Sequence, residues 1–201
     1  MIILTVGAHP DDAELFCGGT LLKLIDRDPS LSIYTVVCSA GNSRSNDRVH
    51  EQELADQFLG VRKGFFLDFN DGEMIHNLKL VNELEKIIDN VQPDYIFAHS
   101  IWDTHQDHLA VAKAIKSANR QKRFNLITYP SYDLTMPFPS NCLVDVTDYF
   151  DRKLKLLSLF ASQQNRWYFQ KEAIVARANG FPFIGRAEKF NVDNLLLFEE
   201  L

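Results

Sequence analysis

Short apolar runs alternate with longer amphipathic stretches from the first residues to Tyr129. The apolar runs are rich in β-branched and aromatic residues, which is typical of buried strands. In one of the stretches between them, Leu80, Leu84, Ile87 and Ile88 recur at helical spacing. We therefore expect strands at 2–8, 31–38, 63–68, 94–99 and 125–129, and helices at 13–27, 47–59, 78–91 and 109–119.

This alternation predicts an α/β fold, a Rossmann-like doubly wound and mostly parallel sheet with helices on both faces. In the strand order 3-2-1-4-5, the first and fourth strands are neighbours at the point where the winding reverses. Ligands of such sheets bind in the crevice at the carboxyl ends of those strands. With 201 residues, 46% of them hydrophobic, we expect one domain over 1–201.

After Tyr129 the pattern is less regular. The proline-rich stretch 130–140 is either a loop at the rim of a site or a plain connector. A helix capped by Thr147 or Asp148 is expected to run to about Ser162. A further helix is expected at 164–178, ending near Gly180, and the tail at 190–198 has the apolar character of a strand.

Side chains that bind metals follow the first expected strand directly. His9 offers an imidazole nitrogen, and Asp11 and Asp12 offer carboxylate oxygens, all of which are zinc ligands. Because the two aspartates are adjacent, they cannot easily serve one ion in the same way. One can bind the metal while the other handles protons. The alternative is that Asp11 or Asp12 only caps the following helix.

A second polar cluster follows the fourth expected strand. It contains Asp103, His105, Asp107 and His108, just before the expected helix at 109–119. Because the first and fourth strands are neighbours in the expected sheet, the two histidine loops should face each other across the switch point. Three protein ligands with one open position form a catalytic zinc site.

The stretches His9-Pro10-Asp11-Asp12, Gly18-Gly19-Thr20 and His105-x-Asp107-His108 resemble the paired signatures of the LmbE-like, or PIG-L-like, deacetylase family. Members of that family use zinc to remove acetyl groups from molecules that contain N-acetylglucosamine. The resemblance extends over most of the chain, with weaker short matches in its second half.

The resemblance implies that His9, Asp12 and His108 bind zinc and leave a position open for water. By ligand type, Fe²⁺ or Mn²⁺ could take the place of Zn²⁺. Asp11, beside the metal water, would take its proton and pass it to the leaving amine. General acid–base catalysis of this kind typically accelerates a reaction by about 10²–10⁴-fold.

The resemblance also implies roles for the second cluster. His105 would donate to the developing oxyanion. Asp107 would hydrogen-bond His105, fix its orientation and favour its protonated form. The alternative for Asp107 is a helix N-cap. Glu14 is expected to orient or cap rather than to catalyse.

Substrate contacts are expected from Arg44 and Arg48, which flank the loop after the second strand. Arg48 would hold a sugar hydroxyl or an anionic aglycone; alternatively it only pairs with Glu51 on the helix surface. Asp71 is a weaker candidate on another loop. One departure concerns Phe160, because many relatives carry a histidine just before the Ser-Gln pair, and this puts the identity of the substrate in doubt.

Composition narrows the class of protein. The net charge of −6 and the absence of a Lys/Arg-rich run argue against nucleic-acid binding. Three cysteines without a CxxC pair suit a reducing compartment. The sequence shows neither a signal peptide nor a membrane span, so we expect a soluble cytoplasmic enzyme. A homo-oligomer is compatible with the sequence.

Three functions are compatible with these observations. The leading hypothesis is a zinc-dependent N-deacetylase that acts on a small N-acetyl-amino-sugar compound. The second is an amidase that removes a larger acyl group from an aminosugar conjugate, because the sequence does not fix the size of the acyl pocket. The third is a non-catalytic sugar- or nucleotide-binding domain, which would have little need for Asp11 beside a metal.

Overall fold

The computed structural model describes residues 1–40, 46–179 and 184–194. Within them a seven-stranded sheet has the order β3-β2-β1-β4-β5-β7-β6. The first five strands pair in parallel and in the predicted order, whereas β7 runs antiparallel to both β5 and β6. The strands are β1 (Ile2–Gly7), β2 (Ser32–Val37), β3 (Lys63–Phe66), β4 (Tyr95–His99), β5 (Asn125–Tyr129), β6 (Cys142–Asp145) and β7 (Ala187–Asn194).

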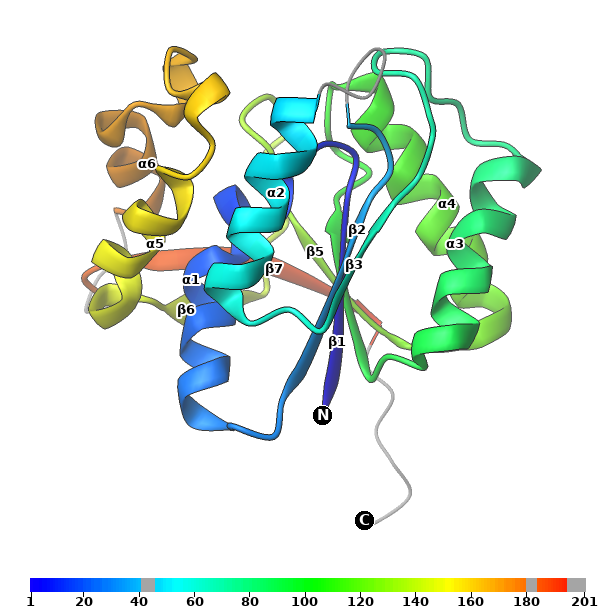
Figure 1. Ribbon diagram of the computed structural model, residues 1–201, viewed down its shortest axis with the longest axis horizontal. Helices are drawn as coiled ribbons and strands as arrows, with labels where there is room; N and C mark the ends of the chain where they lie inside the picture. Colours follow the sequence, from blue (N-terminus) through cyan, green and yellow to red (C-terminus); the bar gives the residue numbers. More distant parts are fainter. Residues whose placement is uncertain (41–45, 180–183, 195–201) are drawn as a thin grey trace.

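Helices cover both faces of the sheet, as Figure 1 shows. The helices α3 and α4 lie on one face, and α1, α2, α5 and α6 lie on the other. This arrangement confirms the predicted doubly wound α/β fold. The helices are α1 (Asp12–Arg27), α2 (Asn46–Leu59), α3 (Leu78–Val91), α4 (Gln106–Lys122), α5 (Phe150–Leu157) and α6 (Lys171–Ala178).

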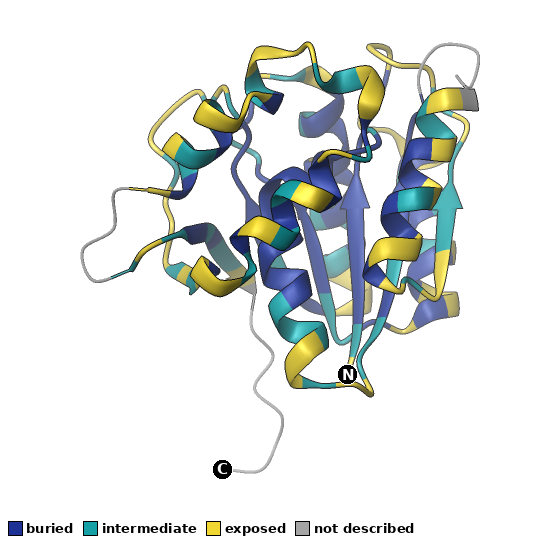
Figure 2. Ribbon diagram, turned by 60° about the vertical axis from the view of Figure 1, so that its left-hand side comes forward, coloured by how far each residue is buried: buried dark blue, intermediate teal, exposed yellow. Residues whose placement is uncertain are grey.

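The core consists of two apolar layers, one on each face of the sheet. Successive side chains of a strand point to opposite faces. Ile3 of β1 and Phe97 of β4 therefore pack in the layer beneath α1 and α5. Leu4 and Ile96, their neighbours in the chain, pack in the layer beneath α3 and α4. The central strands β1, β4 and β5, which lie between the two layers, are almost entirely buried (Figure 2).

The structure differs from the predicted elements after β5. The expected helix at 147–162 is a 3₁₀ turn η1 (Thr147–Tyr149), then α5, which ends at Leu157, and then the 3₁₀ turn η2 (Ala161–Gln163). The expected helix at 164–178 is the 3₁₀ turn η3 (Trp167–Phe169) followed by α6. The amide and hydroxyl of Ser162 both donate to Glu51 on α2, so contacts distant in sequence hold this segment away from a continuous helix.

Gly19 in α1 marks a close approach to β7 and to the residue Val146 that precedes η1. A Cβ at Gly19 would lie 3.0 Å from Cβ of Val146 and 3.1 Å from Oε1 of Glu188. The Gly19 amide donates to Glu188 at 2.9 Å. Lys153 donates to the same carboxylate and to the carbonyl of Leu15, the latter at 2.7 Å. A buried ion pair from α5 and β7 thus binds the backbone of α1 where glycine leaves it accessible.

Among the helices of the described ranges, none combines the length and the apolar character needed to cross a membrane. The side chains of Cys17, Cys38 and Cys142 are free thiols. Burial raises the pKa of both Cys17 and Cys38, so these two thiols stay protonated at neutral pH.

Candidate active site

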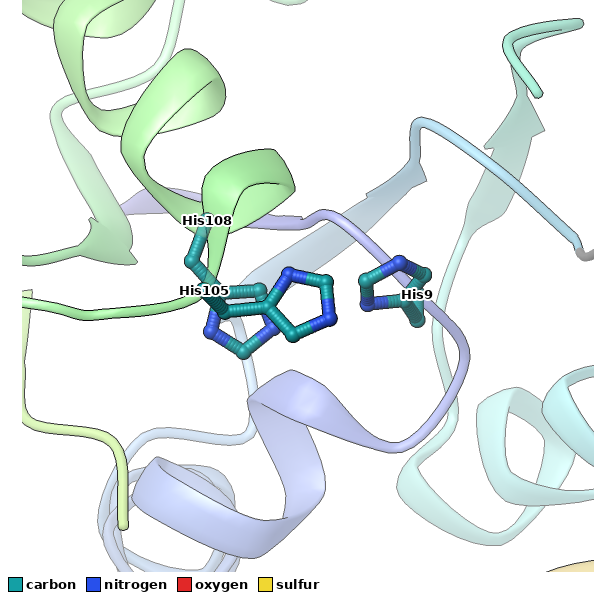
Figure 3. Close-up of side chains that lie close together, drawn as sticks. All are labelled: His9, His105 and His108. Carbon is teal, nitrogen blue, oxygen red and sulfur yellow. The ribbon is translucent and has the colours of Figure 1, made fainter. Parts of the chain in front are cut away.

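The two histidine loops meet at the switch point of the sheet. Strands β1 and β4 are paired, with Val6 opposite Ala98, so the loops that follow them leave the sheet side by side. Figure 3 shows the rings of His9, from the first loop, and of His105 and His108, from the start of α4, turned toward one another. The ring centre of His9 lies 5.0 Å from that of His105 and 5.4 Å from that of His108.

Asp12 lies between the two histidines that the sequence assigns to metal binding. Its Oδ1 is 3.4 Å from Nε2 of His108, and its Oδ2 is 3.7 Å from Nδ1 of His9. Oδ2 also accepts a hydrogen bond from the backbone amide of His9 at 2.7 Å, which fixes the loop around the first turn of α1. The fold therefore brings the expected set of His9, Asp12 and His108 together.

In each of these two histidines, a carboxylate other than that of Asp12 contacts the second ring nitrogen. Oδ2 of Asp107 lies 3.0 Å from Nε2 of His9, and Oδ2 of Asp103 lies 2.8 Å from Nδ1 of His108. Metal-binding histidines characteristically donate their other ring nitrogen to a carboxylate in this way. The contacts leave Nδ1 of His9 and Nε2 of His108 facing Asp12. Within the described residues, three groups have donor atoms close enough to hold one metal ion, and the expected ligands His9, Asp12 and His108 are distributed over them: His9–His105–His108, Asp12–His99–His108 and His9–Asp71–Asp107.

The predicted pairing of Asp107 with His105 is wrong in this structure. The Asp107 carboxylate points from the first turn of α4 to His9, and it also accepts hydrogen bonds from the amides of Gly72 and Met74 at 2.7 and 3.0 Å. His105 instead accepts from the backbone amide of Asp107 through Nδ1, at 3.2 Å. His105 is therefore the N-cap of α4, and Asp107 joins three segments around His9.

Asp11 has a constrained backbone and a charged partner. Its φ of 89° lies in the left-handed region, which is uncommon for a residue other than glycine. Although Asp11 occupies the N-cap position of α1, its side chain makes no capping bond. Its carboxylate accepts from Arg48 on α2, and its amide donates to Oε1 of Gln52, also on α2, at 3.2 Å. Two side chains of one helix thus hold both the carboxylate and the backbone of Asp11.

These groups line a cavity of about 660 Å³. Its lining extends from His9 and Asp11 to Tyr132 on the segment 130–140 and to Trp167 on η3. That segment therefore contributes to the rim of the site. The size lies within the range of pockets that bind small molecules and cofactors.

Residues 4–119 of the chain match the model of the family PIG-L, described as GlcNAc-PI de-N-acetylase. The match spans more than half of the 201 residues and includes both histidine loops. This chain belongs to the PIG-L family.

Individual proteins are also similar to this chain in sequence or in fold. The uncharacterized deacetylase YaiS of Escherichia coli (strain K12) is 37% identical over 127 residues, which are 59% of this chain and 68% of that protein. The probable N-acetyl-alpha-D-glucosaminyl L-malate deacetylase 2 of Bacillus anthracis is 24% identical over 185 residues, 80% of each chain. The conserved protein TT1542 of Thermus thermophilus has the same fold, with a TM-score of 0.80, 24% identity and coverage of 98% of this chain and 96% of that one.

In this PIG-L deacetylase, the pKa values of the neighbouring residues Asp11 and Asp12 are shifted in opposite directions. Burial raises the pKa of Asp11 to about 7, although the charge of Arg48 opposes the shift. Burial also disfavours the charged form of Asp12, but the charges of His108 and His99 outweigh it and hold the pKa of Asp12 well below its usual range. Carboxyl groups whose pKa values are driven apart are typical of acid–base sites.

Neighbouring charged side chains also shift the pKa values of the histidines in the PIG-L site. Burial lowers the pKa of His9, but the carboxylates of Asp107 and Asp71 more than offset it and raise it to about 10. The pKa of His105 is lowered by burial and by the nearby charges of His108 and His9. Because Nδ1 of His105 accepts a hydrogen bond, the proton of its neutral ring lies on Nε2.

Sequence reasoning missed several contacts of this site. His99, for which the sequence offered no motif partner, is fully buried, stacks on His108 with ring centres 3.9 Å apart and lies 3.1 Å from Oδ2 of Asp12. Asp71 was a weak candidate for substrate binding, yet its Oδ1 lies 3.0 Å from Nε2 of His9. The sequence did offer one signal for His99: it is the last residue of β4, and β4 ends at the switch point, where ligands of such sheets bind.

The predicted substrate contacts have different outcomes. Arg44 lies outside the residues that the structure describes. Arg48 lines the cavity, contacts Asp11, and also lies 3.8 Å from Glu51, the pairing that the sequence left open. Glu14 is buried, accepts from Gln52 at 2.8 Å and so supports the residue that holds Asp11. Phe160, which departs from the family pattern, is fully buried in the core beneath α1 and α5.

Proposed function

We propose that this PIG-L deacetylase removes the N-acetyl group from a small N-acetyl-amino-sugar compound of the N-acetylglucosamine type. The observation that carries the proposal is the position of a buried carboxylate, Asp11, beside a histidine–aspartate donor set in one small-molecule cavity. The relative from Bacillus anthracis, whose name specifies an N-acetyl-glucosaminyl malate, supports the substrate class.

His9, Asp12 and His108 would hold the metal, with zinc as the first choice and Fe²⁺ or Mn²⁺ as alternatives by ligand type. A zinc ion held there supplies Lewis acidity toward the acetamide carbonyl and toward water. Asp103 and Asp107 fix the ring orientations of His108 and His9, so that one nitrogen of each ring faces Asp12. By accepting the proton of the far ring nitrogen, these carboxylates also make the nitrogen that faces Asp12 a stronger ligand.

Asp11 acts as the general base and then as the general acid. Arg48 binds Oδ2 of its carboxylate, so we assign the transferred proton to Oδ1. The proton comes from the attacking water and passes to the nitrogen of the departing amino sugar. Burial raises the pKa of Asp11 to about 7, close to the value at which one group can serve both steps.

His105 stabilises the oxyanion of the tetrahedral intermediate as a neutral donor. Its Nδ1 accepts from the Asp107 amide, which leaves the Nε2–H group to donate to the substrate oxygen. This role differs from the one expected from the sequence, in which Asp107 would favour a protonated His105. Arg48 and Arg44 are proposed to contact the substrate from the rim, and for Arg48 this is a role in addition to holding Asp11.

The experiment is an assay of acetate release from a panel of N-acetylglucosamine compounds, with the purified protein loaded with zinc or stripped of metal. We expect release from at least one compound that depends on added zinc and disappears in Asp11→Asn. Release of a longer acyl group but not of acetate would identify the amidase alternative. Binding of sugars without any release would support a binding domain and overturn the proposal.

A further inference from the structure

Trp167 is a large apolar side chain left open to solvent at the cavity. It is 60% exposed, and it lines the same cavity as His9 and Asp11. Exposing an indole ring costs free energy, because burial of an aromatic side chain contributes strongly to stability. A tryptophan that remains exposed inside a binding cavity therefore points to a ligand that covers it.

The ring of Trp167 rests on a wall of other aromatic groups. Its centre lies 5.2 Å from that of Tyr132 and 5.8 Å from that of Tyr168, in edge-to-face geometry in both cases. The hydroxyl of Tyr132 donates to the carbonyl of Tyr168 at 2.8 Å, which ties the segment 130–140 to η3. The guanidinium of Arg177 lies 3.6 Å from the ring centre of Tyr132 and packs it from behind. The wall is thus fixed before any ligand arrives.

Polar groups accompany this wall. Gln163 and Arg166 line the cavity next to Trp167 and offer an amide and a guanidinium. The axial C–H groups of a polyhydroxylated ring form an apolar face that fits the electron-rich face of an indole. The hydroxyls around such a ring require donors and acceptors at its edge. An exposed indole flanked by an amide and a guanidinium meets both requirements.

We propose that Trp167 forms a second subsite, which binds a polyhydroxylated ring attached to the acetylated sugar. This inference rests on the proposed function: the acetamide lies at the end of the cavity with Asp11 and His9, and the attached ring stacks on Trp167. The ring is either a second pyranose or a cyclitol, which share this chemistry. Trp167 thereby selects substrates with two rings over those with one.

The kinetic test compares a one-ring substrate, N-acetylglucosamine, with two-ring substrates, N,N′-diacetylchitobiose and N-acetylglucosaminyl-inositol. In Trp167→Ala, the ratio of kcat/KM for a two-ring substrate to that for the one-ring substrate should fall about tenfold. Trp167→Phe should retain part of the ratio, because it keeps an aromatic face. Leu78→Ala, which removes another exposed apolar side chain outside the cavity lining, is the matched control and should leave the ratio unchanged.

A second measurement does not depend on turnover. The chain has two tryptophans, so Trp102→Phe leaves Trp167 as the sole indole, and Asp11→Asn in the same chain prevents hydrolysis. Diacetylchitobiose or the inositol conjugate should change the emission of Trp167, and the stronger response identifies the kind of ring. N-acetylglucosamine should change it much less.

The possible outcomes separate the two proposals. An unchanged kinetic ratio in Trp167→Ala, or no emission change with either two-ring compound, would overturn the subsite. Absence of acetate release from all three sugars in wild-type protein would overturn the proposed function instead, while the emission titration would still decide whether Trp167 binds a ring.

Discussion

Both terminal nitrogens of the Arg48 guanidinium donate hydrogen bonds to the same carboxylate oxygen of Asp11, at 3.1 and 3.2 Å. One of these nitrogens also donates to the carbonyl of Pro10 at 2.6 Å. Arg48 therefore holds the side chain of Asp11 and the backbone immediately before it. Because Asp11 has a left-handed backbone, which costs free energy outside glycine, the surrounding contacts must stabilise it.

Arg48→Met should lower kcat about 10- to 100-fold, the range expected for the loss of hydrogen bonds to a charged group. Metal content should stay near that of wild type, because Arg48 contacts Asp11 rather than the expected metal ligands. Arg48→Lys should recover only part of kcat, since an ammonium keeps the charge but not the planar fork. Steady-state kinetics with metal analysis provides the measurement. A raised KM at unchanged kcat would show that Arg48 contacts substrate instead.

Substitution of Asp11 and of the adjacent Asp12 should lower activity for different reasons. Asp11→Asn should keep the metal and lower turnover by about 10²-fold or more, because an amide cannot accept the proton. Asp12→Asn should be poor in metal and partly rescued by added zinc, because a charged ligand is replaced by a neutral one. Metal analysis and a zinc titration of activity distinguish the two. Equal loss of metal in both variants would contradict this division of roles.

Substitution of the individual histidines tests which of them bind the metal. The purified protein should bind about one divalent ion per chain, as expected for a single catalytic site. His9→Ala and His108→Ala should largely abolish binding. His105→Ala is the matched control, since His105 also offers a ring nitrogen within 4.8 Å of those of the other two, and it should retain the ion. Elemental analysis after dialysis provides the measurement, and retention of the ion in the first two variants would refute the assignment.

Asp107 and Asp103, which contact the rings of His9 and His108, should strengthen metal binding without contacting the ion themselves. Asp107→Asn and Asp103→Asn should each weaken metal binding about 10- to 100-fold, because the histidine loses the group that orients it. Asp71→Asn removes a more exposed partner of the same His9 nitrogen and should have a smaller effect. Competition with a chelator of known affinity measures all three. An equal loss in Asp71→Asn would show that both partners hold His9.

The glycine pair in α1 offers a test of stability. Gly19→Ala should lower the free energy of unfolding by about 1–3 kcal/mol through overpacking, although alanine favours helices. The new Cβ would meet Cβ of Val146 at 3.0 Å and Oε1 of Glu188 at 3.1 Å. Gly18→Ala, whose new Cβ would meet the flexible end of Leu156 at 3.1 Å, is the matched control and should cost less. Urea denaturation compares the variants, and equal stabilities would exclude the close approach as the cause.

Local patterns in the sequence predicted the parts of this protein that neighbouring residues determine. The bounds of α3 at Leu78–Val91 and of β5 at Asn125–Tyr129 agree with the structure, because periodicity and turn residues lie within each segment. The order of the first five strands also agrees. Because parallel strands share one ligand-binding edge, the strand order was enough to bring the two histidine loops together.

Only the tertiary structure decided which side chains pair. Asp107 and His105 are close in sequence, but Asp107 contacts His9, because its place in the first turn of α4 points it across the switch point. The insertion of β7 between β5 and β6, with Glu188 against α1, likewise depends on residues far apart in the chain. The assignment of catalytic and metal-binding roles stays a prediction. Periodicity records which face of an element is buried, whereas the partner of a polar side chain depends on how whole elements pack.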